Sequence, residues 1–186
     1  MAVFAVILDS CVLYPMYLRD TLLCAAEAGL YQPHWTEEIL KGAFRNLIKD
    51  ERITHQKADS LEKLLNKAFP EAMIQITPKL IPCMDNHEGD RHVLAAALIA
   101  KAQVIVTDNL KHFPASSLTQ FRIEAQSADT FLTSLFDLSP ETMVNVLRTQ
   151  VKGKTKPKLT VLDLLDLLKH QTPTLVQRYQ TSNLIN

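Results

Sequence analysis

The chain has 186 residues, 47% of them hydrophobic, and its 20 Lys and Arg residues balance its 20 Asp and Glu residues. This length predicts one domain with a substantial core and a small helical appendage. The formal net charge of zero gives no support for a general polyanion-binding surface, so a nucleic acid would have to bind at a local patch.

Cysteine usage and hydropathy narrow the cellular setting. The three cysteines are widely spaced and form no C-x-x-C pair, which favours free thiols in a reducing compartment. The apolar start MAVFAVILDS lacks a basic leader and a small-residue cleavage site, and no apolar run reaches the length of a membrane span. We therefore expect a cytoplasmic protein without a membrane partner.

Apolar runs typical of strands alternate with amphipathic segments along most of the chain. The first run, AVFAVIL, is continuous and rich in Val and Ile, as in a parallel strand buried on both faces. Gly29 is suited to end a helix, and Thr36 and Ser127 are suited to cap the helices that follow them. The expected elements are strands at 2–8, 72–76, 103–107 and 121–126 and helices at 18–28, 37–50, 56–69, 90–102 and 127–136. This alternation predicts an α/β fold with a mainly parallel sheet.

After Leu138 the pattern becomes helical. The segment SPETMVNVLRTQV begins with Ser, Pro and Glu, which is a strong helix start, and TVLDLLDLLKHQ is amphipathic at helical spacing. We expect these two helices to form a C-terminal extension over 139–186, following an α/β domain over 1–138.

Three acidic residues stand at the ends of predicted elements. Asp9 follows the first strand, Asp108 follows the strand VIVT, and Asp90 begins the helix that leads to that strand. Parallel sheets bind ligands beyond the carboxyl ends of their strands, and carboxylates brought together there favour a hard divalent cation such as Mg²⁺ or Mn²⁺. Asp90 could instead cap its helix, and Asp108 could be an ordinary turn residue.

Several longer motifs resemble the PIN-domain nucleases, closest to the bacterial branch with a C-terminal helical extension. They are VILDSCVLYP with LRD, WTEEI with RN, GDRHVLAAA and VIVTDNLKHFP. The resemblance as a whole extends from Val3 to at least Phe131. The resemblance implies a three-layer α/β/α sandwich and hydrolysis of RNA phosphodiester bonds with Mg²⁺ or Mn²⁺. It also implies a toxin of a toxin–antitoxin pair, with a small DNA-binding antitoxin as partner, and pairing of two copies.

The resemblance carries over to individual residues. Asp9 and Asp90 match acids of the family's metal site, and its last acidic or amide position falls on Asp108 or Asn109. Gly42 stands where this branch has a further metal-site glutamate. Glu38 lies one helical turn earlier on the same face, where it could replace the missing ligand or simply complement the helix dipole.

Other polar residues flank these motifs. Arg19, Arg45 and Arg91 could bind substrate phosphates, or equally form structural ion pairs. His87 and Glu88 lie in the polar loop before Asp90, as solvated residues or as outer-sphere partners of a metal.

Two functions remain open from the sequence. The first is a metal-dependent endoribonuclease that is the toxin of such a pair, with Asp9, Asp90 and Asp108 or Asn109 at the catalytic site. The second is a weakly active or inactive PIN-like module that binds RNA or protein, which is favoured by Gly42.

Overall fold

A parallel four-stranded sheet lies at the centre of the computed structural model, which describes residues 3–153 and 158–182. The strand order is β2-β1-β3-β4. The central pair is in register with Leu8 opposite Val106. The strands are β1 (Ala5–Leu8), β2 (Gln32–His34), β3 (Val104–Val106) and β4 (Glu124–Gln126).

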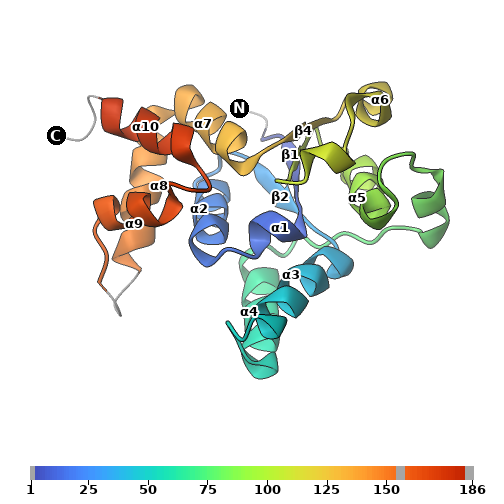
Figure 1. The fold of residues 1–186 in the computed structure, drawn as a ribbon, viewed down its shortest axis with the longest axis horizontal. Helices are drawn as coiled ribbons and strands as arrows, with labels where there is room; N and C mark the ends of the chain where they lie inside the picture. The colour runs from blue at the N-terminus through green and yellow to red at the C-terminus, as the bar shows by residue number, and fades with distance from the viewer. Residues whose placement is uncertain (1–2, 154–157, 183–186) are drawn as a thin grey trace.

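Helices cover both faces of this sheet, so the chain has the expected three-layer α/β/α architecture with C-terminal helices. Figure 1 shows α5 on one side of the sheet and α2, α7 and α8 on the other. The helices are α1 (Ser10–Leu13), α2 (Met16–Glu27), α3 (Glu37–Lys49), α4 (His55–Ala68), α5 (Arg91–Ala100), α6 (Ala115–Leu118), α7 (Ala128–Leu138), α8 (Pro140–Lys152), α9 (Val161–Leu168) and α10 (Pro173–Thr181). Short 3-10 helices are η1 (Pro78–Cys83), η2 (Glu88–Asp90), η3 (Leu110–His112) and η4 (Thr119–Phe121).

The core lies on both faces of the sheet, and the central strands and α5 contribute fully buried residues to it. Val6, Ile7 and Leu8 of β1 are fully buried, as expected for a strand covered on both faces. Residues 93–97 of α5 are also fully buried, and three of them are alanines. Small side chains let this helix approach β1 and β3 closely, which explains why its sequence is apolar nearly all round.

Local helix signals predict the observed boundaries well. The Thr36 hydroxyl accepts a hydrogen bond from Ile39 N at 3.2 Å, and Ser127 Oγ accepts one from Thr130 N at 3.1 Å. Gly29 follows α2 with a φ of 77°, which a residue with a side chain rarely adopts. These three predictions are confirmed because each depends only on residues within one helical turn.

The predicted strand at 72–76 is wrong. Met73 forms a single parallel bridge with Trp35, through hydrogen bonds from Trp35 N to Ala72 O and from Ile74 N to Trp35 O. A ladder cannot extend further because β2 ends at His34 and Thr36 already caps α3. β2 itself was not predicted, since its sequence QPH is short and contains a proline, which is tolerated at a sheet edge.

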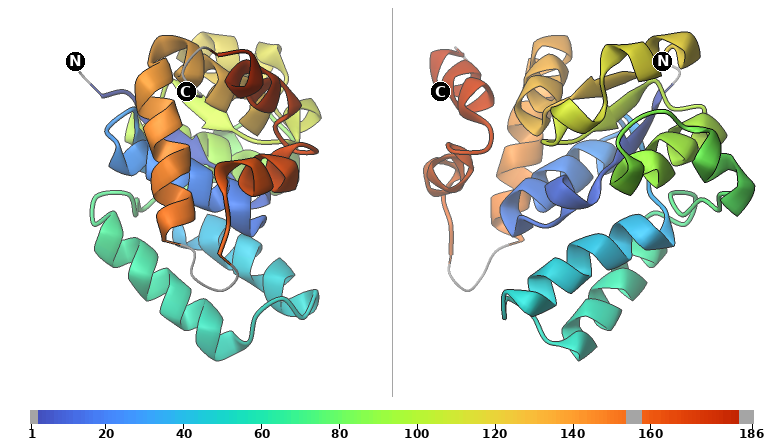
Figure 2. Two further views of the ribbon diagram at one scale, coloured as in Figure 1. Left: turned by 90° about the vertical axis from the view of Figure 1, so that its left-hand side faces the viewer. Right: turned by 45° about the vertical axis from the view of Figure 1, so that its right-hand side comes forward.

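The C-terminal extension contains one helix more than predicted. The additional helix α10 begins with Pro173 and packs on α7. The Asp129 carboxylate of α7 accepts hydrogen bonds from Thr174 N and Leu175 N, at 3.0 Å each for its Oδ1. Figure 2 shows the C-terminal helices gathered at one end of the molecule. The domain division at residue 138 stays a prediction.

No helix in the described ranges combines the length and apolar character that a bilayer crossing requires.

Candidate functional site

A crevice is expected where the direction of strand addition reverses, at the carboxyl ends of β1 and β3. The chain adds β2 on one side of β1, and β3 with β4 on the other. Ligands of open α/β sheets bind at such a switch point, outside the carboxyl ends of the strands. Asp9 follows β1 directly, and Thr107, Asp108 and Asn109 follow β3. The fold therefore brings these two predicted polar segments to one edge.

Asp9 is a buried carboxylate, with 2% of its surface exposed. Its Oδ1 accepts hydrogen bonds from Ser10 N at 2.6 Å and Ser10 Oγ at 3.3 Å. Its Oδ2 accepts one from Thr107 Oγ1 at 2.7 Å and a weak one from Cys11 Sγ at 3.4 Å. Burial of a carboxylate is costly unless such donors compensate it, so the surroundings of Asp9 are built to hold this group.

Cys11 lies against Asp9 without the properties of a nucleophile. Burial, followed by the negative charge of Asp9, raises the pKa of the Cys11 thiol to about 12. The thiol is therefore protonated at neutral pH, where it donates to Asp9 and accepts a hydrogen bond from Asp108 N at 3.3 Å. Cys11 supports the acid rather than competing with it.

The two residues after Thr107 differ in their surroundings. Asp108 is exposed, and its Oδ1 accepts a long hydrogen bond of 3.4 Å from Ala128 N at the start of α7. Asn109 is half-buried, and its backbone N donates to Thr107 Oγ1 at 3.1 Å. Among the described residues the Asn109 side chain has no hydrogen-bond partner, which leaves its amide oxygen available to a ligand.

Asp90 is engaged in a contact that the sequence did not predict. It occupies the N-cap position of α5, but its side chain makes no capping hydrogen bond. Instead its Oδ2 lies 2.5 Å from His112 Nδ1 and 3.9 Å from His87 Nδ1. In the described part of the chain, His87, Asp90 and His112 form a group whose metal-ligand atoms all lie within 4.8 Å of one another. His112 was missed because nothing in its local sequence points to Asp90.

Position 42 lies beside the first acid. A Cβ atom at Gly42 would be 3.3 Å from Ser10 Cβ and 3.6 Å from Ser10 Oγ. A side chain at this position of α3 would therefore start against the residue that follows Asp9. Glu38 is exposed and one turn nearer the start of α3.

The three predicted phosphate-binding arginines have different environments. Arg45 is exposed on α3, and Arg91 is half-buried with its Nε donating to Asn86 O at 3.3 Å. Arg19 is buried, and its Nη1 donates to Leu13 O at 2.8 Å. Burial lowers the pKa of the Arg19 guanidinium, and the Asp20 carboxylate opposes that shift. These contacts give Arg19 a structural role at the end of α1.

Arg19 also lines a hollow of about 580 Å³ between the α/β domain and the C-terminal helices. Arg52 and His170 line it as well, together with Tyr14, which is the C-cap residue of α1. Because Asp9 is the N-cap residue and Tyr14 the C-cap residue of the four-residue helix α1, this hollow lies at the other end of α1 from the acid.

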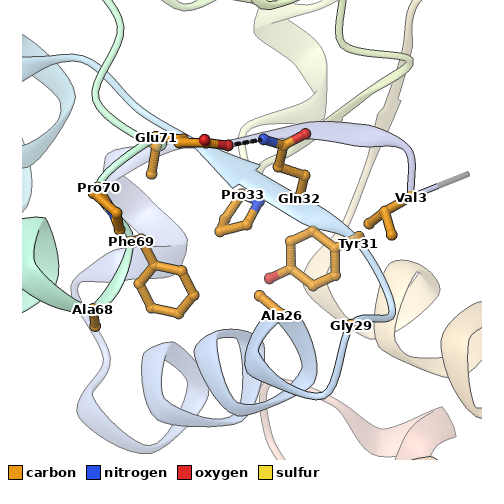
Figure 3. A pocket seen from close by; sticks show the side chains of 11 residues that line it. Val3, Ala26, Gly29, Tyr31, Gln32, Pro33, Ala68, Phe69, Pro70 and Glu71 are labelled. Atoms are coloured by element: carbon orange, nitrogen blue, oxygen red, sulfur yellow. Dashed lines mark hydrogen bonds between the residues drawn. The ribbon is translucent and has the colours of Figure 1, made fainter.

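A second hollow, of about 490 Å³, lies at the opposite edge of the sheet. Figure 3 shows the rings of Tyr31 and Phe69 facing it, with a hydrogen bond from Gln32 Nε2 to Glu71 at its rim. Val3 and Gln32 precede or begin strands, whereas Asp9 follows one. This hollow is therefore remote from the acids.

The donor set at the carboxyl edge suits the predicted Mg²⁺ or Mn²⁺. Asp9 and Asn109 offer carboxylate and amide oxygens, which hard cations prefer, and such ions retain several waters and need few direct protein ligands. Two of the four hydrogen bonds to Asp9, from Ser10 Oγ and Cys11 Sγ, are long and easily exchanged. Among the described residues Asp9, Asp90 and Asp108 do not form a group within 4.8 Å, so their sharing of one ion stays a prediction.

Comparison with protein families identifies the family of the chain. A model of the PIN domain matches residues 5–111, more than half of the chain, and a model described as the VapC50 C-terminal domain matches residues 128–181. The chain belongs to the PIN-domain family.

One curated relative is a protein of Mycobacterium tuberculosis named "Putative ribonuclease VapC50". It is 46% identical to this chain over 94 residues, which cover 50% of this chain and 56% of the relative. The matched stretch thus spans about half the length of that protein. No solved structure matches the chain.

Proposed function

We propose that this protein is a metal-dependent endoribonuclease and the toxin of a toxin–antitoxin pair. The observation that carries the proposal is the buried Asp9 carboxylate at the β1/β3 switch point of a PIN-family chain. The name of the mycobacterial relative supports ribonuclease activity, and the second family match supports the same branch of the family.

Different residues of this chain bind the cation and orient its ligands. Asp9, Asp90 and Asn109 or Asp108 hold the cation, while Thr107 and Ser10 fix the orientation of Asp9 through their hydrogen bonds. A bound Mg²⁺ or Mn²⁺ supplies a water of lowered pKa and positive charge for the phosphoryl oxygens. The task of the protein itself would be to bind the phosphodiester and hold it in a fixed orientation beside these residues.

Substrate binding falls to cations around the edge. Arg45 on α3 and Arg91 beside Asp90 are accessible to solvent and suited to phosphate contacts. Arg52 and Tyr14, in the hollow next to α1, offer a cation and an aromatic ring to a single-stranded RNA.

The expected partners follow from the family. RNA is the substrate, a small DNA-binding antitoxin is the regulatory partner, and two copies of the chain pair. The compartment in which all three meet is the cytoplasm.

A second function is favoured by one observation, the absence of a side chain at Gly42 beside Ser10. If the missing carboxylate is essential, the chain is a PIN-like module that binds RNA or a partner protein without cutting RNA efficiently. Glu38, one turn away on α3, is the nearest predicted replacement on that helix.

Cleavage of single-stranded RNA with and without Mn²⁺ separates the two functions. The nuclease is supported if the wild type cleaves only with Mn²⁺ and Asp9→Asn lowers the rate at least about 100-fold, since loss of an outer-sphere partner alone typically costs 10–100-fold. RNA binding without cleavage in both proteins supports the binding module instead.

A further inference from the structure

The loop before α5 and the turn after β3 form a second cluster of ligand-type side chains. His87 precedes η2, Asp90 ends it, and His112 ends η3. One backbone hydrogen bond joins these segments, from His87 N to His112 O at 3.2 Å, and a second, from Asp90 N to His87 O at 2.9 Å, closes the turn between His87 and Asp90. The imidazole rings of the two histidines are stacked, with centroids 3.9 Å apart and planes inclined by 10°.

This cluster is reachable from solvent, and its structural contacts are local: His87 caps η2, and Asp90 contacts His112. The side chains of Asp90, His112 and His87 are 19%, 24% and 56% exposed. Asp90 does not cap α5, although it stands at the position where a capping side chain is expected. Because the Asp90 carboxylate contacts the His112 imidazole instead of capping α5, it is placed to bind a ligand together with that imidazole.

We propose that His87, Asp90 and His112 form a binding site for a borderline transition-metal cation, Zn²⁺ in particular. Two imidazoles and one carboxylate are the ligand types that Zn²⁺ accepts, whereas Mg²⁺ prefers oxygen ligands alone. Three protein ligands leave the fourth tetrahedral position to water. The site differs in its donors from the oxygen-rich edge around Asp9 and shares with it only Asp90.

Small movements convert the observed cluster into a zinc site. With bonds of about 2.0–2.1 Å, tetrahedral ligand atoms lie about 3.3 Å apart. The Asp90–His112 contact would open from 2.5 Å, and the Asp90–His87 separation would close from 3.9 Å. For His112 Nδ1 to bind the ion, its ring proton has to lie on Nε2, which is a change of tautomer of the neutral imidazole.

His87 makes the largest adjustment. Lone pairs lie in the plane of an imidazole, so two parallel stacked rings cannot both point at one ion, and one ring has to turn. His87 is the exposed member, and its ring contacts are a 3.3 Å hydrogen bond from Gly89 N to Nδ1, the 3.9 Å separation from Asp90 and the stacking on His112. Rotation of the His87 ring therefore costs little. The backbone hydrogen bond between the two segments keeps Asp90 and His112 in place.

Sharing of Asp90 has a consequence that depends on the proposed nuclease function. An Asp90 carboxylate bound to Zn²⁺ on the histidine side is withdrawn from the cation at the Asp9 edge. Zn²⁺ is therefore an inhibitor of Mn²⁺-dependent RNA cleavage, acting through His87 and His112.

Calorimetric titration of the full chain with ZnCl₂, without RNA, tests the site directly. We expect one ion per chain, and affinity lowered at least about 10-fold in His112→Asn and in His87→Asn. Asn retains a hydrogen-bond donor for Asp90 at position 112, which limits damage to the fold. His92→Asn, on the first turn of α5 outside the cluster, is the matched control and should bind like the wild type.

Asp9→Asn distinguishes this inference from the proposed function. If the site is as proposed, this variant keeps Zn²⁺ affinity even where RNA cleavage is lost or was never present. Loss of Zn²⁺ binding in Asp9→Asn with retention in both histidine variants would place the ion at the acidic edge and overturn the proposal. Absence of Zn²⁺ binding by a wild type with intact circular dichroism would overturn it too.

Two further readouts do not depend on affinity alone. Co²⁺ in place of Zn²⁺ should give visible ligand-field absorption that disappears in His87→Asn, an exposed substitution that leaves the fold intact. Where the wild type cleaves RNA, micromolar Zn²⁺ at fixed Mn²⁺ should inhibit it and leave His87→Asn uninhibited. Equal inhibition of both proteins would contradict the sharing of Asp90.

Discussion

The sharpest test of the acidic edge is to restore a carboxylate at position 42. A side chain there begins 3.3 Å from Ser10 Cβ, next to the residue whose N–H holds Asp9. We expect Gly42→Glu to bind Mn²⁺ at least about 10-fold more tightly than Gly42→Ala, because loss of even an outer-sphere partner changes metal affinity by 10–100-fold. RNA cleavage at subsaturating Mn²⁺ should rise by a similar factor.

The effect on stability is small and can be worked from the helix. Replacing glycine by alanine inside α3 stabilises the helix by about 1 kcal/mol. The 3.3 Å contact requires Ser10 to shift by a few tenths of an ångström, and mild overpacking costs about 1 kcal/mol. The two contributions nearly cancel, so the Tm of Gly42→Ala should stay within about 2–4 °C of the wild type, the shift expected for 1 kcal/mol.

Calorimetric Mn²⁺ titration, thermal unfolding and cleavage of single-stranded RNA on the wild type and both variants complete the test. Gly42→Ala carries the same Cβ contact, so the difference between the variants isolates the carboxylate. Equal Mn²⁺ affinity in two folded variants would refute the placement of position 42 at the metal site.

Three further changes probe the groups around these sites. Thr107→Val keeps the shape of the residue but removes the hydroxyl that donates to the buried Asp9. We expect the free energy of unfolding in urea to fall by about 1–3 kcal/mol and the rate of RNA cleavage to fall by about 10–100-fold. Thr107→Ser should restore both. Folding raises the pKa of the Cys11 thiol from 9.0 to about 12, so between these pH values the folded protein keeps a proton that the unfolded chain loses. The free energy of unfolding should therefore fall between pH 9 and 12 more steeply in the wild type than in Cys11→Ser. Equal slopes in the two proteins would contradict the burial of the thiol. Asp129→Ala removes the acceptor for the first N–H groups of α10, so limited proteolysis should cut that helix while the α/β domain stays resistant. Asp137→Ala is the control: it removes only an exposed ion pair with Arg178 and should leave α10 resistant.

The features that sequence could predict share a physical basis in short-range interactions. Thr36 and Ser127 cap helices through N–H groups three residues away, so their role is visible in a window of four residues. The parallel direction of the strands was also predictable, because apolar runs separated by helices pair in parallel. Parallel strands place Asp9 and Asp108 at the same end of the sheet, and the structure adds that Thr107 donates a hydrogen bond to Asp9 there.

The features that sequence missed depend on where a segment meets a distant one. β2 is a strand only because it finds β1 at the edge of the sheet, and Met73 is confined to one bridge because β2 ends beside it. α10 is fixed by a carboxylate 45 residues earlier in the chain. Neither the proline in β2 nor the short amphipathic run of α10 carries that information by itself.

Asp90 shows why a site residue can be found while its chemistry stays undetermined. Its position before an apolar helix is compatible with a cap or with a ligand, and both uses place an acid at the same residue. The choice is made by His112, 22 residues away, because η3 turns the chain back after β3 and delivers an imidazole to the carboxylate. A cap would have satisfied Asp90 within its own helix. The observed contact instead joins it to η3, whose N-cap residue is Asn109, so the ligand chemistry of this residue is decided by tertiary structure.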